Sequence, residues 1–387
     1  MKRYALLLAL TSAIPSLASA EGSNAFNPDI ALILSGTYGQ FQHDPAGYAI
    51  PGVPLTADSG PGERGFTLGE SELSMSANID PDWYGLLTFA MAGDNTTSVE
   101  NAYVQTTSLG NGVTVRGGRF FSGIGYLNEQ HAHTWDFVDT ALPYRAFLGT
   151  QYKDDGVQLR WVAPLDLFTE FGAEWLNGSN FPAGGSANNG RGAWSTYVHV
   201  GDDVGDSNSW RAGLSYLATK AVDRNTISVN PANDDLFTGT SKLLVADFVW
   251  KWAPMGNATQ RNFKLQAEYL HVNNDGDFTP AGGTVIPYDG KNNGWYVQGI
   301  YQFMPRWRIG LRHDQIRTND PGIAFTGTVL DPQGHNPSRN SLMLDFSNSE
   351  FSRLRLQFNR DESALVADNQ WFLQYQMSLG AHGAHQF

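Results

Sequence analysis

The chain has 387 residues and a formal net charge of −13, and it contains no cysteine. The absence of cysteine excludes disulfide scaffolds, Cys-ligated zinc and thiol catalysis, and the negative charge argues against a nucleic-acid partner, because phosphate contacts need a basic surface. Charged residues make up only 16% of the chain, whereas it holds 42 glycines and 12% aromatic residues, a composition unlike that of soluble domains.

The first twenty residues have the pattern of a secretory signal peptide. Lys2 and Arg3 precede a short apolar run, 4–10, and the stretch ends in Ala18-Ser19-Ala20, which places small residues at −3 and −1 of a cleavage site. A membrane anchor, the alternative, needs about 20 apolar residues. We therefore expect 1–20 to be removed as a signal peptide and 21–387 to form the exported protein without a helical anchor.

The mature chain alternates apolar and polar residues with a period of two, as in 113–116, 157–161, 263–269 and 354–358. This period is typical of strands with one apolar and one polar face, which occur in soluble sandwiches and in membrane barrels. Long charged side chains on the polar face and aromatic residues near the segment ends favour an aqueous lumen and an interfacial girdle. The predicted fold is therefore an all-β, transmembrane, antiparallel β-barrel, which satisfies its backbone hydrogen bonds in lipid by closing.

About sixteen strands are predicted, and about fourteen or eighteen remain alternatives. Short turns alternate with long connections at 42–65, 122–155, 178–192, 220–240, 274–293 and 317–339, as in outer-membrane barrels, and an even strand count places both termini on the periplasmic side. The predicted strands are 29–41, 66–79, 83–93, 98–107, 113–121, 156–163, 168–177, 193–201, 209–219, 241–252, 261–273, 294–303, 307–316, 340–347, 350–359 and 371–379.

The polar phase of these strands is expected to face the lumen, where charged walls decide which solutes pass. One stretch of wall would be basic, because four arginines lie on neighbouring strands, and other stretches would be acidic; the alternative is that all these residues are merely solvated. The predicted lumen residues are Glu70, Glu72, Arg116, Arg160, Glu170, Glu174, Lys264, Glu268, Arg308, Arg312, Asp345, Arg353 and Arg355.

The longest connection, 122–155, joins the fifth and sixth predicted strands and is rich in apolar residues, among them Ile124, Trp135 and Phe147. Apolar loop residues need a surface to pack on, so the loop is expected to fold into the barrel and narrow the pore. Its polar side chains would then form the constriction: Glu129, His131, His133, Asp136, Asp139 and Arg145.

His131 and His133 stand two residues apart, so in an extended segment they point the same way. Together with Glu129, Asp136 or Asp139 they would suit transient zinc binding, because imidazole and carboxylate are zinc ligands. The alternative is two polar residues that line the constriction or bind the wall. No other cofactor is predicted, because no phosphate-binding glycine-rich loop is present.

Several segments resemble known outer-membrane families. Gly117-Gly118-Arg119-Phe120-Phe121, which leads into the long loop, resembles the phosphate-selective porin O/P branch of porins. Segments 127–139 (LNEQHAHTWDFVD), 350–357 (EFSRLRLQ) and 378–385 (SLGAHGAH) resemble a proteobacterial porin-like family whose members carry labels such as zinc-regulated outer-membrane protein or TonB-dependent receptor. The resemblance spans the mature chain, and it implies a pore-forming barrel in the outer membrane of a Gram-negative bacterium.

The leading prediction is a passive porin for small hydrophilic solutes or ions, with an anion or zinc preference left open, and not an enzyme. One alternative is a zinc-binding surface receptor, and another is a barrel hydrolase that uses Ser122 with His131 or His133 and Asp136. The alternating segment 371–379 and the terminal Phe387 resemble the signal read by the barrel assembly machinery. The other expected partners are outer-membrane lipid and, as in many porins, two further copies in a homotrimer.

Overall fold

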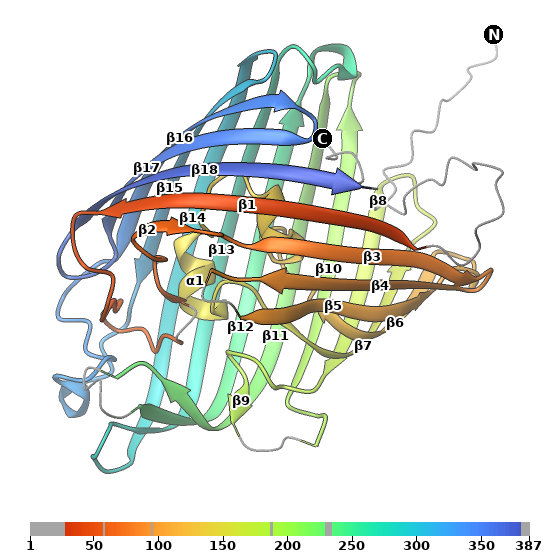
Figure 1. Cartoon of the computed structure of the whole chain (residues 1–387). Helices are drawn as coiled ribbons and strands as arrows, with labels where there is room; N and C mark the ends of the chain where they lie inside the picture. Colours follow the sequence, from red (N-terminus) through yellow and green to blue (C-terminus); the bar gives the residue numbers. More distant parts are fainter. Residues whose placement is uncertain (1–27, 57–58, 94–95, 186–188, 229–233, 381–387) are drawn as a thin grey trace, which may run out of the picture.

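The computed structural model describes residues 28–56, 59–93, 96–185, 189–228 and 234–380, so the predicted signal peptide and Phe387 lie outside the described residues. The described chain forms one antiparallel sheet that closes on itself (Figure 1). Its long strands are β1 (Asp29–Phe41), β3 (Ser71–Asp80), β4 (Trp83–Met91), β5 (Thr97–Thr106), β6 (Val113–Phe121), β7 (Lys153–Val162), β8 (Phe168–Leu176), β10 (Ala193–Val204), β11 (Asn208–Thr226), β12 (Asp235–Trp252), β13 (Asn262–Thr279), β14 (Ile286–Met304), β15 (Trp307–Arg317), β16 (Ser338–Ser349), β17 (Ser352–Glu362) and β18 (Asp368–Gly380).

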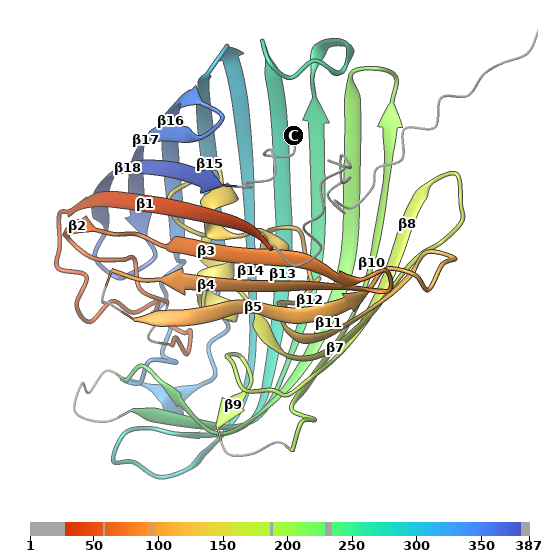
Figure 2. The same cartoon turned by 45° about the vertical axis from the view of Figure 1, so that its right-hand side comes forward.

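The sheet is a sixteen-stranded meander closed by its first and last strands. β1 pairs with β18 from Ala31↔Gly380 to Phe41↔Gln370 and with β3 on its other side, and Figure 2 shows these strands next to one another. Two short strands lie outside the meander: β2 (Gly65–Thr67) pairs with β1, and β9 (Gly184–Gly185) pairs in parallel with β11. The predicted antiparallel barrel and its strand number are confirmed.

Side chains alternate between the two faces of the wall, as the period of two predicts. On β17, Leu354 and Leu356 are 43% and 45% exposed, whereas Arg355 between them is 1% exposed. Apolar side chains on the outside and charged ones inside are the reverse of a soluble protein and fit a lipid surround. The soluble sandwich is therefore wrong, and this architecture places the chain in the outer membrane of a Gram-negative bacterium. Among the described residues, no helix is long and apolar enough to cross a membrane.

The hairpins β11–β12 and β13–β14 are longer than predicted. Their strands have 18 or 19 residues, so the connections predicted at 220–240 and 274–293 are wrong over much of their length. A tilted strand crosses a bilayer with about 9–11 residues, so roughly half of each strand extends beyond the lipid. There the ladder continues between polar residues, such as Asn274 opposite Gly290, without the alternation that a membrane imposes.

The connection between β6 and β7, residues 122–152, lies inside the barrel; we call it the lumen loop. It contains η2 (Leu127–Glu129), η3 (Ala132–Thr134) and the helix α1 (Leu142–Leu148), and Figures 1 and 2 show α1 within the ring of strands. α1 starts with a proline in its first turn and ends at Gly149 with a φ of 61°, a left-handed cap that glycine adopts without strain. Two further 3-10 turns, η4 (Pro254–Gly256) and η5 (Ile323–Phe325), lie in other connections.

Apolar residues hold the lumen loop in place. The buried cluster joins loop residues to Ile50, Val53 and Leu55 of the β1–β2 connection and to inward side chains of the wall such as Leu270. Burying one apolar side chain of this size stabilises the folded state by about 1.5–3 kcal/mol. This explains why such an apolar connection lies within the barrel instead of in water.

Candidate functional site: the lumen loop and its contacts with the wall

Buried glutamates of the wall bind the backbone where the lumen loop begins. Glu174 of β8 accepts hydrogen bonds from the Gly123 amide at 2.8 Å and from the Ser122 hydroxyl. Glu268 of β13 accepts from the amides of Tyr126 at 3.0 Å and Leu127 at 2.9 Å. A carboxylate that accepts several N–H bonds satisfies loop donors that no strand partner reaches, so these two glutamates fix the first turn of the loop.

Two aspartates of the loop bind cations of the wall. Asp139 accepts from Arg312 Nη2 at 2.6 Å and from Arg339 Nη1 at 2.8 Å. Asp136 pairs with Arg308 at 3.2 Å and with Lys264. These contacts reach β13, β15 and β16, so together with Glu174 of β8 they tie the lumen loop to well-separated strands of the wall.

The predicted arginine cluster exists, but it is not a free basic surface. Arg308 and Arg355 lie on either side of Asp345 in the paired strands β15, β16 and β17, and Arg308 Nη2 is 2.5 Å from Asp345. Arg312 forms an ion pair with Asp139. Arg353 instead donates to two neutral acceptors, the His133 carbonyl at 2.8 Å and the Gln376 amide oxygen. Loop and wall carboxylates therefore offset much of the charge that the sequence places on this wall.

The cations also decide the charge state of the loop aspartates. Burial by itself would raise the pKa of Asp139, but Arg339, Arg312 and Arg145 outweigh it and hold the pKa well below its usual range. Lys264 and Arg308 do the same for the pKa of Asp136. Both carboxyls are therefore charged at neutral pH, as a buried ion pair requires.

Glu129, predicted at the constriction, faces cations of the wall. Its carboxylate lies 3.9 Å from Arg160 and 4.0 Å from Arg211. Arg160 is held mainly by Glu170, with Nη2 2.9 Å from that carboxylate. Arg211 was not predicted at the lumen, because it stands near the start of β11, where the alternation is weak.

Arg145 and Arg116 occupy different surroundings, although both were predicted at the pore. Arg145 is buried on α1, and its Nη2 is 3.5 Å from Asp139. Arg116 of β6 donates to the Gln105 amide oxygen at 3.1 Å and lies 4.2 Å from the centre of the Tyr103 ring. Arg145 therefore stabilises the loop from within, and Arg116 binds its neighbouring strand.

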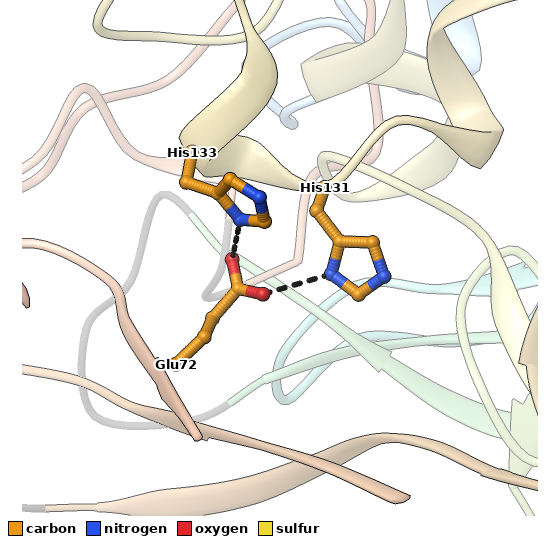
Figure 3. Close-up of side chains that lie close together, drawn as sticks. All are labelled: Glu72, His131 and His133. Carbon is orange, nitrogen blue, oxygen red and sulfur yellow. Dashed lines mark hydrogen bonds and ion pairs between the residues drawn. The ribbon is translucent and has the colours of Figure 1, made fainter. Parts of the chain in front are cut away.

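The two loop histidines converge on a wall carboxylate. His131 Nδ1 lies 3.0 Å from Glu72 Oε2, and His133 Nδ1 lies 2.7 Å from Glu72 Oε1 (Figure 3). Glu72 stands at the start of β3. The sequence predicted that the third metal ligand would be Glu129, Asp136 or Asp139. That prediction is wrong, because those carboxylates face arginine and lysine side chains.

A β-bulge brings a second carboxylate to His131. The register between β4 and β5 shifts between Thr88 and Phe89, so Glu100 and Asn101, neighbours in the chain, both point inward. Glu100 Oε2 lies 3.0 Å from His131 Nδ1, and Asn101 Nδ2 lies 2.9 Å from His131 Nε2. Strict alternation would direct one of these residues outward, so the sequence pattern misses the pair; bulges re-aim side chains in this way.

The surroundings favour a charged imidazole at His131. Burial alone would lower the pKa of His131, but Glu72 and Glu100 outweigh it and raise the pKa to about 10. The same two glutamates and two histidines offer oxygen and nitrogen donors that suit a transition-metal ion.

The structure does not assemble the alternative hydrolase site. The Ser122 hydroxyl donates to Glu174, whereas His131 and His133 bind Glu72. Nucleophilic catalysis requires a base within hydrogen-bond reach of the nucleophile, so Ser122, the histidines and Asp136 do not form a catalytic set.

A cavity of about 780 Å³ lies between the lumen loop and the short turns of the barrel, the periplasmic side of such proteins. Its acidic lining residues are Asp136 and Glu350, and its outer rim includes Arg306 of the β14–β15 turn. Neither Arg306 nor Lys251 was among the predicted lumen residues: Arg306 lies in a turn between two predicted strands, and Lys251 lies near the end of the predicted strand 241–252. The basic lining residues are Lys251, Lys264, Arg306, Arg308 and Arg353.

No model of a known protein family matches the chain. An uncharacterized protein of Aquifex aeolicus (strain VF5) is 31% identical over an alignment of 393 positions, gaps included, that covers 94% of this chain and 80% of that protein.

Solved outer-membrane proteins share the fold at low sequence identity. An anion-selective porin from Comamonas acidovorans has a TM-score of 0.58 at 12% identity and covers 91% of this chain and 99% of that one. OprB of Pseudomonas putida has a TM-score of 0.58 at 14% identity, covering 91% and 94%. OmpT of Vibrio cholerae, in its trimer form, has a TM-score of 0.56 at 10% identity, covering 91% and 99%. At these identities the similarity establishes the barrel fold.

Proposed function

We propose that this chain, which belongs to the same protein family as the uncharacterized Aquifex aeolicus protein, forms a passive outer-membrane channel for small hydrophilic solutes. The observation that carries the proposal is a charged loop held inside a sixteen-stranded barrel by wall residues of well-separated strands, Glu72 of β3, Glu174 of β8 and Arg312 of β15. A barrel of about this size is wide enough for water, and a loop inside it sets the width of the path. Diffusion down a gradient needs no cofactor.

The periplasmic cavity supports an anion preference. Five lysine and arginine side chains line it against two carboxylates. Lys264 and Arg308 are paired with Asp136. Arg353 donates to neutral oxygens and Arg306 lies in the β14–β15 turn, so among the lining cations we expect passing solutes to meet these two. A positive field raises the local concentration of anions, and the anion-selective porin with the same fold is consistent with this selectivity.

A zinc-binding receptor is the second candidate function, and the convergence of Glu72, His131 and His133 favours it. Its mechanism would be capture of the metal, not conduction. That the chain is not an enzyme stays a prediction, which porins with this fold support, and contact with the assembly machinery stays a prediction as well. The homotrimer is a proposal that the trimer form of a protein with this fold supports.

Planar-bilayer recording of the purified mature protein tests the proposal. We expect stepwise, ohmic conductance and, in a KCl gradient, a reversal potential that reports higher permeability for chloride than for potassium. Barrels that remain folded, judged by heat-modifiable migration in gels, but give no conductance steps would contradict the channel. Steps with a potassium preference would retain the channel and remove the anion preference.

A further inference from the structure

Two histidines of the lumen loop and one buried glutamate of the wall place three donor atoms together. One nitrogen of His131, one of His133 and one carboxylate oxygen of Glu72 all lie within 4.8 Å of one another. Glu72 is 1% exposed, and the two imidazole rings have their centres 5.7 Å apart. The donors come from two separate parts of the chain, so whatever they bind together joins the loop to β3.

The spacing of these donors is close to that of a metal site. Zinc takes histidine nitrogen and carboxylate oxygen at about 2.0–2.2 Å in a tetrahedron, which puts neighbouring ligand atoms about 3.3–3.5 Å apart. The His131 and His133 nitrogens lie 3.0 and 2.7 Å from the Glu72 oxygens. The two nitrogens contact different oxygens of Glu72, so an ion that replaces the shared protons requires the imidazoles and the carboxylate to turn toward one common point, and the three donor atoms already lie within 4.8 Å of one another.

Two more carboxylates surround the same point. Glu70, Glu72 and Glu100 offer oxygens that also lie within 4.8 Å of one another, and Oε1 of Glu70 is buried without a hydrogen-bond partner among the described residues. Lys153, 3.4 Å from Glu100, is the cation that faces the group from β7. An unsatisfied buried acceptor is costly, and a cation bound beside Glu70 would satisfy it.

Asn101 suits the site in the second coordination shell. Its side-chain amide lies 2.9 Å from Nε2 of His131, the nitrogen away from Glu72. Metal-bound histidines donate their second N–H to an oxygen, and an amide presents its oxygen after a simple flip. Asn101 therefore orients His131 with Nδ1 toward the carboxylates.

We propose that Glu72, His131 and His133 bind a divalent transition-metal ion of the zinc type, with Glu100 as a further donor, and that the ion cross-links the lumen loop to β3 and β5. Two imidazoles select zinc over calcium or magnesium, which prefer oxygen ligands alone. The site goes beyond the proposed channel, because it binds metal whether or not solutes pass.

Isothermal titration calorimetry with zinc chloride tests the site on the mature protein, folded in detergent and freed of metal by a chelator. We expect one zinc ion per chain in the wild type and loss of that binding in Glu72→Gln and in His131→Ala/His133→Ala. Asn101→Ala, a milder change, should weaken binding about 10-fold or more. His313→Ala is the matched control, since His313 lies on the outward face of β15 next to Arg312, and it should bind as the wild type does.

Equal zinc affinity in the wild type, Glu72→Gln and the double histidine variant would overturn the proposal, as would a folded wild type without one-site binding. Migration in gels before and after heating shows whether each variant is folded, and Asn101→Ala keeps the test decisive if the larger changes prevent folding. Bilayer recording on the same samples separates the two proposals: conductance without zinc binding removes only the metal site, and zinc binding without conductance removes only the channel.

Discussion

Arg312 of the wall donates through Nη2 to Oδ1 of Asp139 in the lumen loop at 2.6 Å, and the two residues are 173 positions apart in the chain. The arginine side chain is 2% exposed and the aspartate 10%. A pair this deeply buried is weakly screened by salt and intolerant of losing one partner. The position of the loop in the lumen therefore depends on charged contacts as well as on apolar packing.

Replacing Asp139 by Asn should loosen the lumen loop. Among the described residues, the change leaves Asp314 as the carboxylate that pairs with both Arg312 and Arg339, and removing one partner of a buried ion pair costs about 3–5 kcal/mol. We expect larger or noisier single-channel conductance in planar bilayers. Asp155→Asn is the control, because Asp155 forms an exposed pair with Arg119 and such pairs contribute little. Identical recordings from wild type and Asp139→Asn would show that this ion pair does not hold the constriction.

Deleting residues 124–147 should enlarge the conductance without opening the barrel. The deletion removes α1 and the two histidines but leaves the pairing of β6 with β7 and the closure of β1 on β18. Comparing conductance in the same salt measures the change. An unchanged value in a folded variant would mean that the loop does not restrict the path.

The attachment of the loop should persist into acid solution. The pKa values of Asp136 and Asp139 lie below their usual range because of the neighbouring cations. A carboxyl with a lowered folded pKa stabilises the structure above its unfolded pKa, about 3.9 for aspartate, and this stabilisation is lost as the pH falls through the folded pKa. We expect Asp139→Asn, but not wild type, to show loosened conductance between pH 7 and about pH 4. If the wild-type conductance loosened between pH 7 and about pH 4 and that of Asp139→Asn did not, the lowered pKa values of Asp136 and Asp139 would be contradicted.

Arg353→Gln should reduce the preference for anions. One charge about 10 Å from a passing ion changes its energy by about 0.4 kcal/mol in water, a factor of about two in permeability. Reversal potentials in a KCl gradient measure the ratio of chloride to potassium permeability. Arg360→Gln is the matched control, because Arg360 lies on the outward face of the same strand, 43% exposed and paired with Glu362. Equal shifts in the two variants would show that Arg353 does not act on ions in the lumen.

The sequence by itself determined the barrel. Alternation along segments such as 354–358 specified which side chains face lipid, because every strand in a membrane must present an apolar face and only a closed sheet leaves no backbone group unpaired. The same argument failed beyond the lipid, where β11 to β14 continue as polar strands that no alternation marks. The apolar content of 122–155 predicted burial of that connection, because water is a poor surrounding for Trp135 and Phe147.

Tertiary structure alone decided which charges meet. Asp136 and Asp139 lie within eight residues of both histidines in the sequence, which made them plausible metal ligands. In the folded barrel they instead contact arginines of β15 and β16. The carboxylates that reach His131 come from Glu72 on β3 and from Glu100, which a bulge turns inward. Packing over the whole ring of strands determines where the register shifts and how the loop crosses the lumen. The periodicity of a single segment therefore cannot predict either feature.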